Sequence, residues 1–148
     1  MRFLLYDRVT SIDKGKSITG IKTFTLTEPF LDRHFSRKPL VPSVMFIETM
    51  AQLLGWLIIY SHDFQLTTFL SLIEGANVPP GLRPGFQAEV HAEIGSTHSR
   101  DSLGRATLHV GGVQVASIER IIYGHFHKVD PHLLRRQFGY YSGLEEPR

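Results

Sequence analysis

The sequence predicts an α+β fold in which an antiparallel β-sheet wraps around one long, buried helix. Residues 43–60 carry apolar side chains on nearly every side of a helix, which is typical of a helix buried all round. Several later segments alternate apolar and polar residues at hairpin spacing, which is typical of antiparallel strands. Packing the strands around the helix buries both apolar surfaces in a single core.

The N-terminal third supplies two strands and the start of the helix. Residues 2–27 are rich in Ile, Thr, Phe and Val, and residues 14–16 (Lys-Gly-Lys) provide a turn between two extended runs. Residues 28–43 form a long, proline-containing connection, and a connection of that length is often functional. Pro42 suits the first turn of the helix, and Ser43 can cap it.

The remaining strands follow the helix. Residues 69–78 and 86–96 have the composition or the alternation of strands, and the Gly111-Gly112 pair predicts a hairpin turn. We therefore assign residues 1–124 to one domain and residues 125–148 to a basic C-terminal tail.

Composition excludes several classes of protein. The chain has 148 residues, a net charge of +2 and no cysteine, so disulfides and thiolate metal sites are absent. The basic bias is too weak to predict nucleic-acid binding. The sequence has no glycine-rich phosphate loop, so we expect no nucleotide cofactor. The opening MRFLLYDRV is too short for a signal peptide, and the stretch Val44–Tyr60 is shorter than the roughly 20 residues of a membrane span. We expect a cytoplasmic protein without a membrane span.

Glu48 is an ionisable residue in the apolar helix. Burial raises the pKa of a carboxyl group, and a protonated carboxyl group can donate a proton in catalysis. Gln52 lies four residues later and shares a helix face with Glu48. The alternative is a glutamate at the helix edge whose carboxyl group reaches solvent or an arginine.

His34 lies in the connection, fourteen positions before Glu48. A helix N-terminus offers N–H groups and a positive dipole, which suit the polarisation of a carbonyl oxygen. A base, an acid and a polarised carbonyl are what α,β-elimination from a 3-hydroxyacyl thioester requires. The alternative is an ordinary surface histidine.

These residues resemble a known motif. The chain contains R-H-F-S-R-K-P-L-V-P-S-V, then M-F-I-E and T-M-A-Q. The 3-hydroxyacyl-(acyl-carrier-protein) dehydratases (FabZ/FabA-like) carry G-H-F-P-G-x-P-x-x-P-G-V, then x-x-x-E and A-x-A-Q. Other segments of the chain also resemble the family and follow in the same order: FLLYDRV, DKGKSITGIK, TEPF, VPPGLRPG and VQVASIE. The resemblance therefore covers about residues 1–123.

The resemblance implies a hotdog fold and a dimer in which the two subunits share each active site. By position, His34 is the base that removes the α-proton, and Glu48 is the acid that protonates the departing hydroxyl group. The backbone N–H of Ser43 would polarise the thioester carbonyl, and Gln52 would support Glu48 by a hydrogen bond. The implied product is a trans-2-enoyl thioester of fatty-acid, polyketide or polyene synthesis, and no cofactor is needed.

The chain departs from the family pattern where the family has glycine. Arg33 precedes the histidine, Ser36-Arg37 replaces Pro-Gly, and Ser43 stands at the helix start. Arg33 could fill the pocket or pair with Glu48. Two alternatives therefore stay open: a catalytically degenerate acyl-binding or partner subunit, which would form a heterodimer, and a hotdog thioesterase.

Arg33, Arg37 and Lys38 form a basic group within the motif. The expected partner, acyl carrier protein, is acidic, so these side chains would steer it toward the site. The alternative is three solvated cations on a loop.

Two further groups have weaker interpretations. His125, His127 and His132 could be taken for metal ligands, but Asp130 is the one carboxylate at suitable spacing, and we expect no metal site. The run 56–59 (Trp-Leu-Ile-Ile) suits a helix core and could line the far end of an acyl tunnel.

Overall fold

A computed structural model describes residues 4–32 and 37–144. The elements, in chain order, are β1 (Arg8–Asp13), β2 (Ser17–Phe24), the 3-10 helix η1 (Pro29–Leu31), β3 (Val41–Pro42), α1 (Ser43–Ser61), β4 (Thr67–Asn77), β5 (Gly81–Leu82), β6 (Phe86–Thr97), β7 (Asp101–Val110), β8 (Val113–Phe126) and α2 (Pro131–Ser142).

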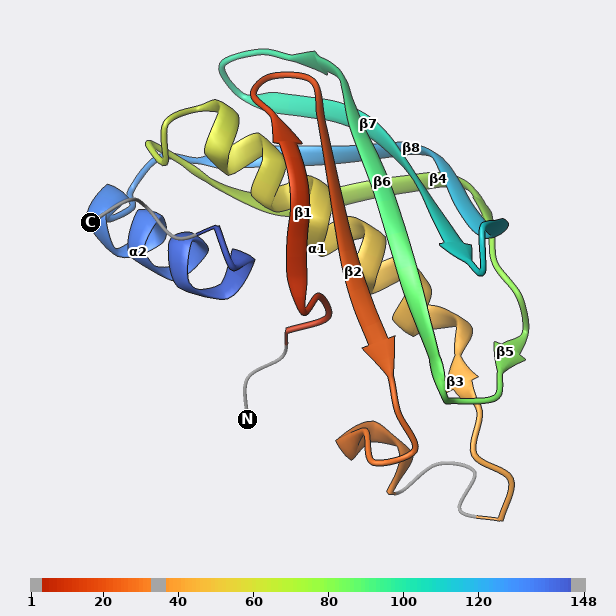
Figure 1. The fold of residues 1–148 in the computed structure, drawn as a ribbon. Helices are drawn as coiled ribbons and strands as arrows, with labels where there is room; N and C mark the ends of the chain where they lie inside the picture. Colours follow the sequence, from red (N-terminus) through yellow and green to blue (C-terminus); the bar gives the residue numbers. More distant parts are fainter. Residues whose placement is uncertain (1–3, 33–36, 145–148) are drawn as a thin grey trace.

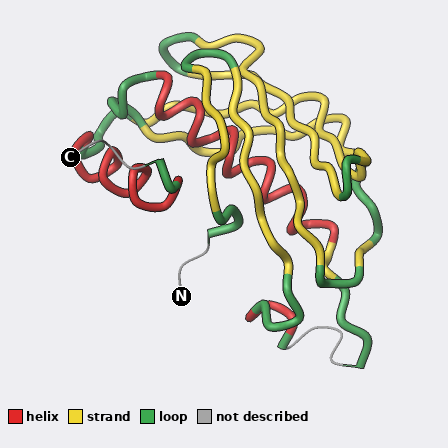
Figure 2. The backbone as a smooth tube through the Cα atoms, in the orientation of Figure 1, coloured by secondary structure: helices red, strands yellow, loops and turns green. Residues whose placement is uncertain are grey.

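The sheet is antiparallel and curls around α1 (Figures 1 and 2). Its six strands lie in the order β1-β2-β6-β7-β8-β4, and β3 and β5 pair separately beside the start of α1. This is the hotdog arrangement, so the predicted fold class is confirmed.

The strand predictions are confirmed because the periodicity that generated them is local. Ala88, Val90 and Ala92 of β6 are buried, whereas the residues between them are more exposed. Gly111 and Gly112 join β7 to β8 with φ values of 59° and 78°, which a two-residue hairpin of type I′ requires.

The helix α1 begins one residue earlier than it would if Ser43 were the capping residue. Pro42 is the N-cap, with extended φ and ψ of −64° and 148°, and no side chain caps the helix. Pro42 pairs with Gly81 in the small sheet, and this pairing holds it extended. Ser43 is therefore the first helical residue, and the prediction that its side chain caps the helix is wrong.

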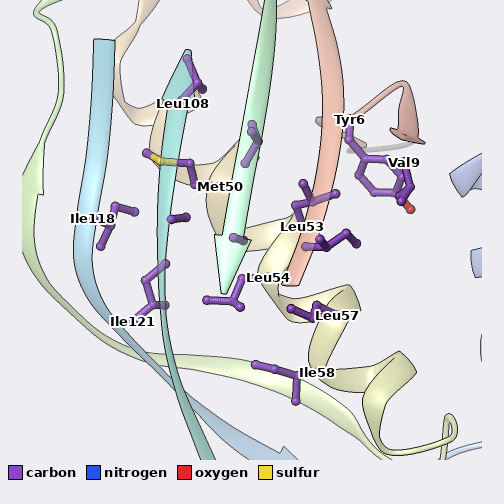
Figure 3. Close-up of a cluster of buried hydrophobic side chains, with 14 of the residues drawn as sticks. Tyr6, Val9, Met50, Leu53, Leu54, Leu57, Ile58, Leu108, Ile118 and Ile121 are labelled. Atoms are coloured by element: carbon purple, nitrogen blue, oxygen red, sulfur yellow. The ribbon is translucent and has the colours of Figure 1, made fainter. Parts of the chain in front are cut away.

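The core is the contact between α1 and the inner face of the sheet, where Figure 3 shows Leu53, Leu54 and Leu57. Two glycines in the strands let the helix approach closely. A Cβ atom on Gly20 would lie 3.1 Å from a methyl carbon of Leu53, and one on Gly104 would lie 2.7 Å from a methyl carbon of Leu54. The helix therefore rests almost on the backbone of the sheet.

The prediction that α1 is buried on every side is wrong along one stripe. Glu48, Gln52, Trp56 and Tyr60 follow at intervals of four residues, and each is half-buried. Among the helices in the described part of the chain, α1 is long and apolar enough to cross a membrane, but the buried core helix of a folded domain meets the same criteria, and 56% of its apolar window is buried here.

The C-terminal residues extend the fold beyond the sheet. The strand β8 continues to Phe126, and α2 follows with Asp130 as N-cap, Pro131 in its first turn and Gly143 after its end with φ of 72°. Phe138 of α2 is 3% exposed and belongs to the core. The predicted basic tail thus contains an ordered helix that packs on the domain.

Polar side chains link the end of α1 to the far end of the sheet. His62 Nε2 lies 2.7 Å from Thr97 Oγ1, which lies 2.6 Å from Ser102 Oγ, and Ser102 Oγ lies 2.8 Å from His125 Nε2. Burial lowers the pKa of His62 below its ordinary value, and the neighbouring His125 and His127 lower it further, while Asp63 opposes them.

The glycine at position 104 predicts a stability effect. Gly104→Ala places a methyl group 2.5 Å from the Glu93 carbonyl oxygen, and we expect the free energy of unfolding to fall by about 1–3 kcal/mol. Gly139→Ala, in α2 with nothing within 4 Å of the new atom, is the control and should raise stability by up to about 1 kcal/mol. Denaturant unfolding measures both, and an unchanged Gly104→Ala protein would contradict the close packing.

His62 predicts a pH effect on stability. Because the folded state lowers the pKa of His62 from 6.5, the unfolded chain binds the proton more readily, so stability should fall as the pH drops below that value. His62→Gln removes the titration and should lose less stability between about pH 7 and pH 5 than the wild type. Thermal melts across this range measure the difference, with His132→Gln on the exposed side of α2 as control. Parallel curves for wild type and His62→Gln would be the contrary result.

Candidate active site

Glu48 lies in the second turn of α1, on the half-buried stripe. One carboxyl oxygen accepts a hydrogen bond of 3.0 Å from Gln52 Nε2. The predicted proximity of the two side chains is therefore present, because residues four apart share a helix face. This hydrogen bond fixes the direction of a carboxyl group that would otherwise rotate freely.

Gln52 also connects α1 to the N-terminal segment. Its Oε1 atom accepts a hydrogen bond of 2.9 Å from the backbone N–H of Leu5. Because the amide oxygen is used in this way, the amide nitrogen has to face Glu48. A contact between residues 47 positions apart thus determines how the carboxyl group is held.

Tyr123 is a further side chain of the site, and the sequence analysis did not single it out. Its hydroxyl group donates to the carbonyl oxygen of Ala51 in α1, and the residue is 3% exposed. Burial raises the pKa of Tyr123, and the charge of Glu48 raises it further, so the phenol stays protonated. Tyr123 could have been predicted to point inward because it follows Ile121 by two residues, which places both on the same buried face of β8.

A groove of about 270 Å³ runs along the half-buried stripe, between α1 and the strands β4 and β8. Its lining is Glu48, Ala51, Gln52, Gly55, Trp56, Ile59, Thr67, Thr68, Leu70 and Tyr123.

The lining of this groove changes character along the helix. Glu48 and Gln52 are at one end, and Trp56 and Ile59 lie two to three turns further along α1. A slender ligand with one polar, reactive end and an apolar remainder matches this distribution. A larger hollow of about 720 Å³ lies elsewhere on the sheet, but its lining includes the Glu93–Arg105 and Glu74–Arg120 ion pairs and none of the predicted catalytic side chains.

Ser43 begins α1, so its N–H is one of the first-turn amides that have no acceptor within the helix. The pairing of β3 with β5 holds the preceding residues and therefore the direction in which the helix starts. A helix N-terminus held in this way favours a partial negative charge on a nearby carbonyl oxygen.

The other predicted site residues lie in the connection before the helix. Arg37 and Lys38 are exposed, between η1 and β3. His34, Arg33 and Ser36 lie outside the described residues. Within the described residues, no three His, Asp or Glu side chains are grouped as metal ligands; His125 and His127 instead lie near the Ser99 carbonyl oxygen, with ring nitrogens 3.3 and 3.1 Å from it.

Sequence comparisons give a consistent family. The FabA-like domain model matches residues 1–75, half of the 148-residue chain. A 3-hydroxyacyl-(acyl-carrier-protein) dehydratase FabZ from Rickettsia bellii is 36% identical over 116 residues, which cover 77% of this chain and 80% of that protein. The FabZ of Variovorax paradoxus is 38% identical over 96 residues, 62% of this chain and 64% of that protein, so this match spans less than two thirds of the relative's length.

Solved structures share the fold at low sequence identity. The dehydratase heterocomplex ApeI:P from Xenorhabdus doucetiae has a TM-score of 0.70 and 14% identity, over 89% of each chain. A thioesterase from Haemophilus influenzae has a TM-score of 0.60 and 10% identity, over 82% of this chain and 80% of that one. These similarities concern the fold alone.

The geometry around Gln52 predicts an effect on stability. Gln52→Ala removes the hydrogen bonds to Glu48 and to the Leu5 N–H, and we expect unfolding free energy to fall by about 1–2 kcal/mol. Gln52→Glu keeps the size but places two carboxyl groups side by side, so its loss should be larger at about pH 8 than at about pH 5. Chemical denaturation at both pH values tests this, and a pH-independent loss in Gln52→Glu would be inconsistent with the contact.

Proposed function

Because the chain belongs to the FabA-like family, we propose that it dehydrates 3-hydroxyacyl thioesters to trans-2-enoyl thioesters. The observation that carries the proposal is the Glu48 carboxyl group, oriented by Gln52 at one end of a groove whose lining also includes the apolar side chains of Trp56, Ile59 and Leu70. An acyl chain can occupy such a groove with its oxygen-bearing end beside the acid.

The proposed reaction needs one base, one acid and one polarising group. His34 takes the proton from the α-carbon, Glu48 gives a proton to the 3-hydroxyl group, and the C–O bond breaks to release water. The N–H of Ser43 stabilises the charge that develops on the thioester oxygen. Electrons move only within the substrate, so the proposed reaction needs no redox cofactor.

We propose that two copies of the chain form the working unit. The strand β4 lies at an edge of the sheet, and its side chains Phe69, Leu70 and Leu72 are 57%, 45% and 41% exposed. An apolar edge strand is a ready template for pairing with another strand. Because β4 also borders the groove, a second copy on this edge would cover it and could supply His34 to Glu48.

The proposed substrate carrier is acyl carrier protein in the cytoplasm. The FabZ relatives are named for substrates on this carrier, and the exposed Arg37 and Lys38 support attraction of an acidic protein. A heterodimer with a related subunit, a non-catalytic acyl-binding role and thioester hydrolysis are the competing possibilities.

Incubation of purified protein with a 3-hydroxyacyl thioester distinguishes these possibilities. Absorbance of the enoyl thioester indicates dehydration, release of free thiol indicates a thioesterase, and binding without either product indicates an acyl-binding subunit. Formation of the enoyl product is the result that we expect.

The roles of His34 and Glu48 predict the behaviour of two variants. His34→Ala and Glu48→Gln should each lower kcat for enoyl formation by about 10²–10⁴-fold, because each removes a proton-transfer group. Glu74→Gln, an exposed carboxyl on the other side of the sheet, is the matched control and should keep wild-type activity. Retention of full activity in Glu48→Gln would refute its assignment as the acid.

The basic connection predicts a difference between substrates. Replacing Arg37 and Lys38 with alanine should lower kcat/KM for a carrier-protein substrate more than for a short pantetheine thioester, and the effect should shrink at high salt. Lys16→Ala, in the exposed β1–β2 turn, is the control. An equal loss on both substrates would argue against steering.

A further inference from the structure

Trp56 lies in the groove, at the opposite end of the groove's helix stripe from Glu48, and it is the one tryptophan of the chain. It follows Glu48 by eight residues on the same stripe of α1, which corresponds to about 12 Å along a helix. Between them is Gly55, where a Cβ atom would lie 3.2 Å from Thr68 Oγ1. Strand β4 thus comes close to α1 at Gly55, and a larger side chain there would narrow the groove, whose lining includes both Gly55 and Trp56.

The indole is held from its other side by α2. The Trp56 and Phe138 rings lie 5.4 Å apart between centroids at an interplanar angle of 34°. Phe138 also packs against Tyr60 at 5.6 Å and Phe64 at 5.8 Å, so α2 inserts one buried side chain into an aromatic cluster at the end of α1. Movement of Trp56 away from the groove would have to disturb this cluster.

The helix α2 is capped at both ends. Asp130 accepts hydrogen bonds from the N–H groups of His132 and Leu133, and Gly143 ends the helix in a left-handed conformation. Figure 1 shows α2 beside the C-terminal part of α1, on the same side as β1. A capped helix at this position can support Trp56 through Phe138.

We propose that Trp56, supported by Phe138 of α2, sets the maximum length of acyl chain that the groove accepts. This inference rests on the proposed function, because it takes the groove as the acyl site. A short chain lies in the groove beside Gly55 and stops before the indole. A longer chain has to displace the indole and loses the packing between Trp56 and Phe138.

Trp56 fluorescence tests the inference without requiring turnover. Saturated acyl-pantetheine thioesters, from butanoyl to hexadecanoyl, lack the 3-hydroxyl group and cannot be dehydrated. Short chains should bind with little change in emission, and emission should shift beyond a threshold length at which affinity also falls. The proposal would be overturned if calorimetry showed binding at every chain length and neither the emission nor the affinity changed beyond any threshold length.

Substitutions test the same limit by activity. Trp56→Ala should extend the range of 3-hydroxyacyl substrates, with a gain in the long-to-short ratio of kcat/KM of about fourfold for each additional methylene accommodated. Phe138→Leu should give a smaller change in the same direction, and Tyr140→Ala, 78% exposed on α2, should give none. A uniform loss at all chain lengths in Trp56→Ala would show that Trp56 is only structural.

The outcomes separate the two proposals. A fluorescence threshold in a protein that forms no enoyl product from any 3-hydroxyacyl thioester would reject dehydration and retain the length limit. Dehydration with a chain-length profile that Trp56→Ala leaves unchanged would reject the length limit and retain the function.

Discussion

The structure depends on the placement of one carboxyl group in an almost wholly apolar helix. Full burial of Glu48 without a partner would cost several kcal/mol or force it to stay protonated. The sheet resolves this by covering one side of α1 and leaving the stripe of Glu48, Gln52 and Trp56 half-buried. Gln52 then holds the carboxyl group by a hydrogen bond, at one end of a groove.

The remaining features of the site follow from how closely α1 lies on the sheet. Gly20 and Gly104 allow the side of α1 that carries Leu53 and Leu54 to lie close to the sheet backbone. This closeness also places the other side of α1, with Glu48 and Gln52, near β4 and β8. Tyr123 joins β8 to α1 through the Ala51 carbonyl. The helix α2 packs Phe138 against Trp56 at the far end, so an element distant in sequence supports one wall of the groove.

The sequence predicted those parts of the fold and site that depend on local pattern. Strand alternation, the Gly111-Gly112 turn and the extent of α1 are local, and so is the four-residue spacing of Glu48 and Gln52. The Leu5 contact to Gln52, the inward position of Tyr123 and the packing of Phe138 on Trp56 each join segments more than 40 residues apart, and nothing local encodes them. The capping role of Ser43 failed because strand pairing of Pro42 overrode a local preference. The roles of His34 and Glu48 came from the resemblance to the dehydratase family and stay predictions.

The central claim is that one subunit supplies His34 and the other supplies Glu48 to the same thioester. Differently tagged His34→Ala and Glu48→Gln chains can be co-expressed, and dimers that contain one of each can be purified. If the groups meet across the subunit interface, each mixed dimer has one intact site of two and should regain about half of the wild-type dehydration rate. Mixed dimers no more active than either parent variant would contradict the claim, because both groups would then belong to a single subunit.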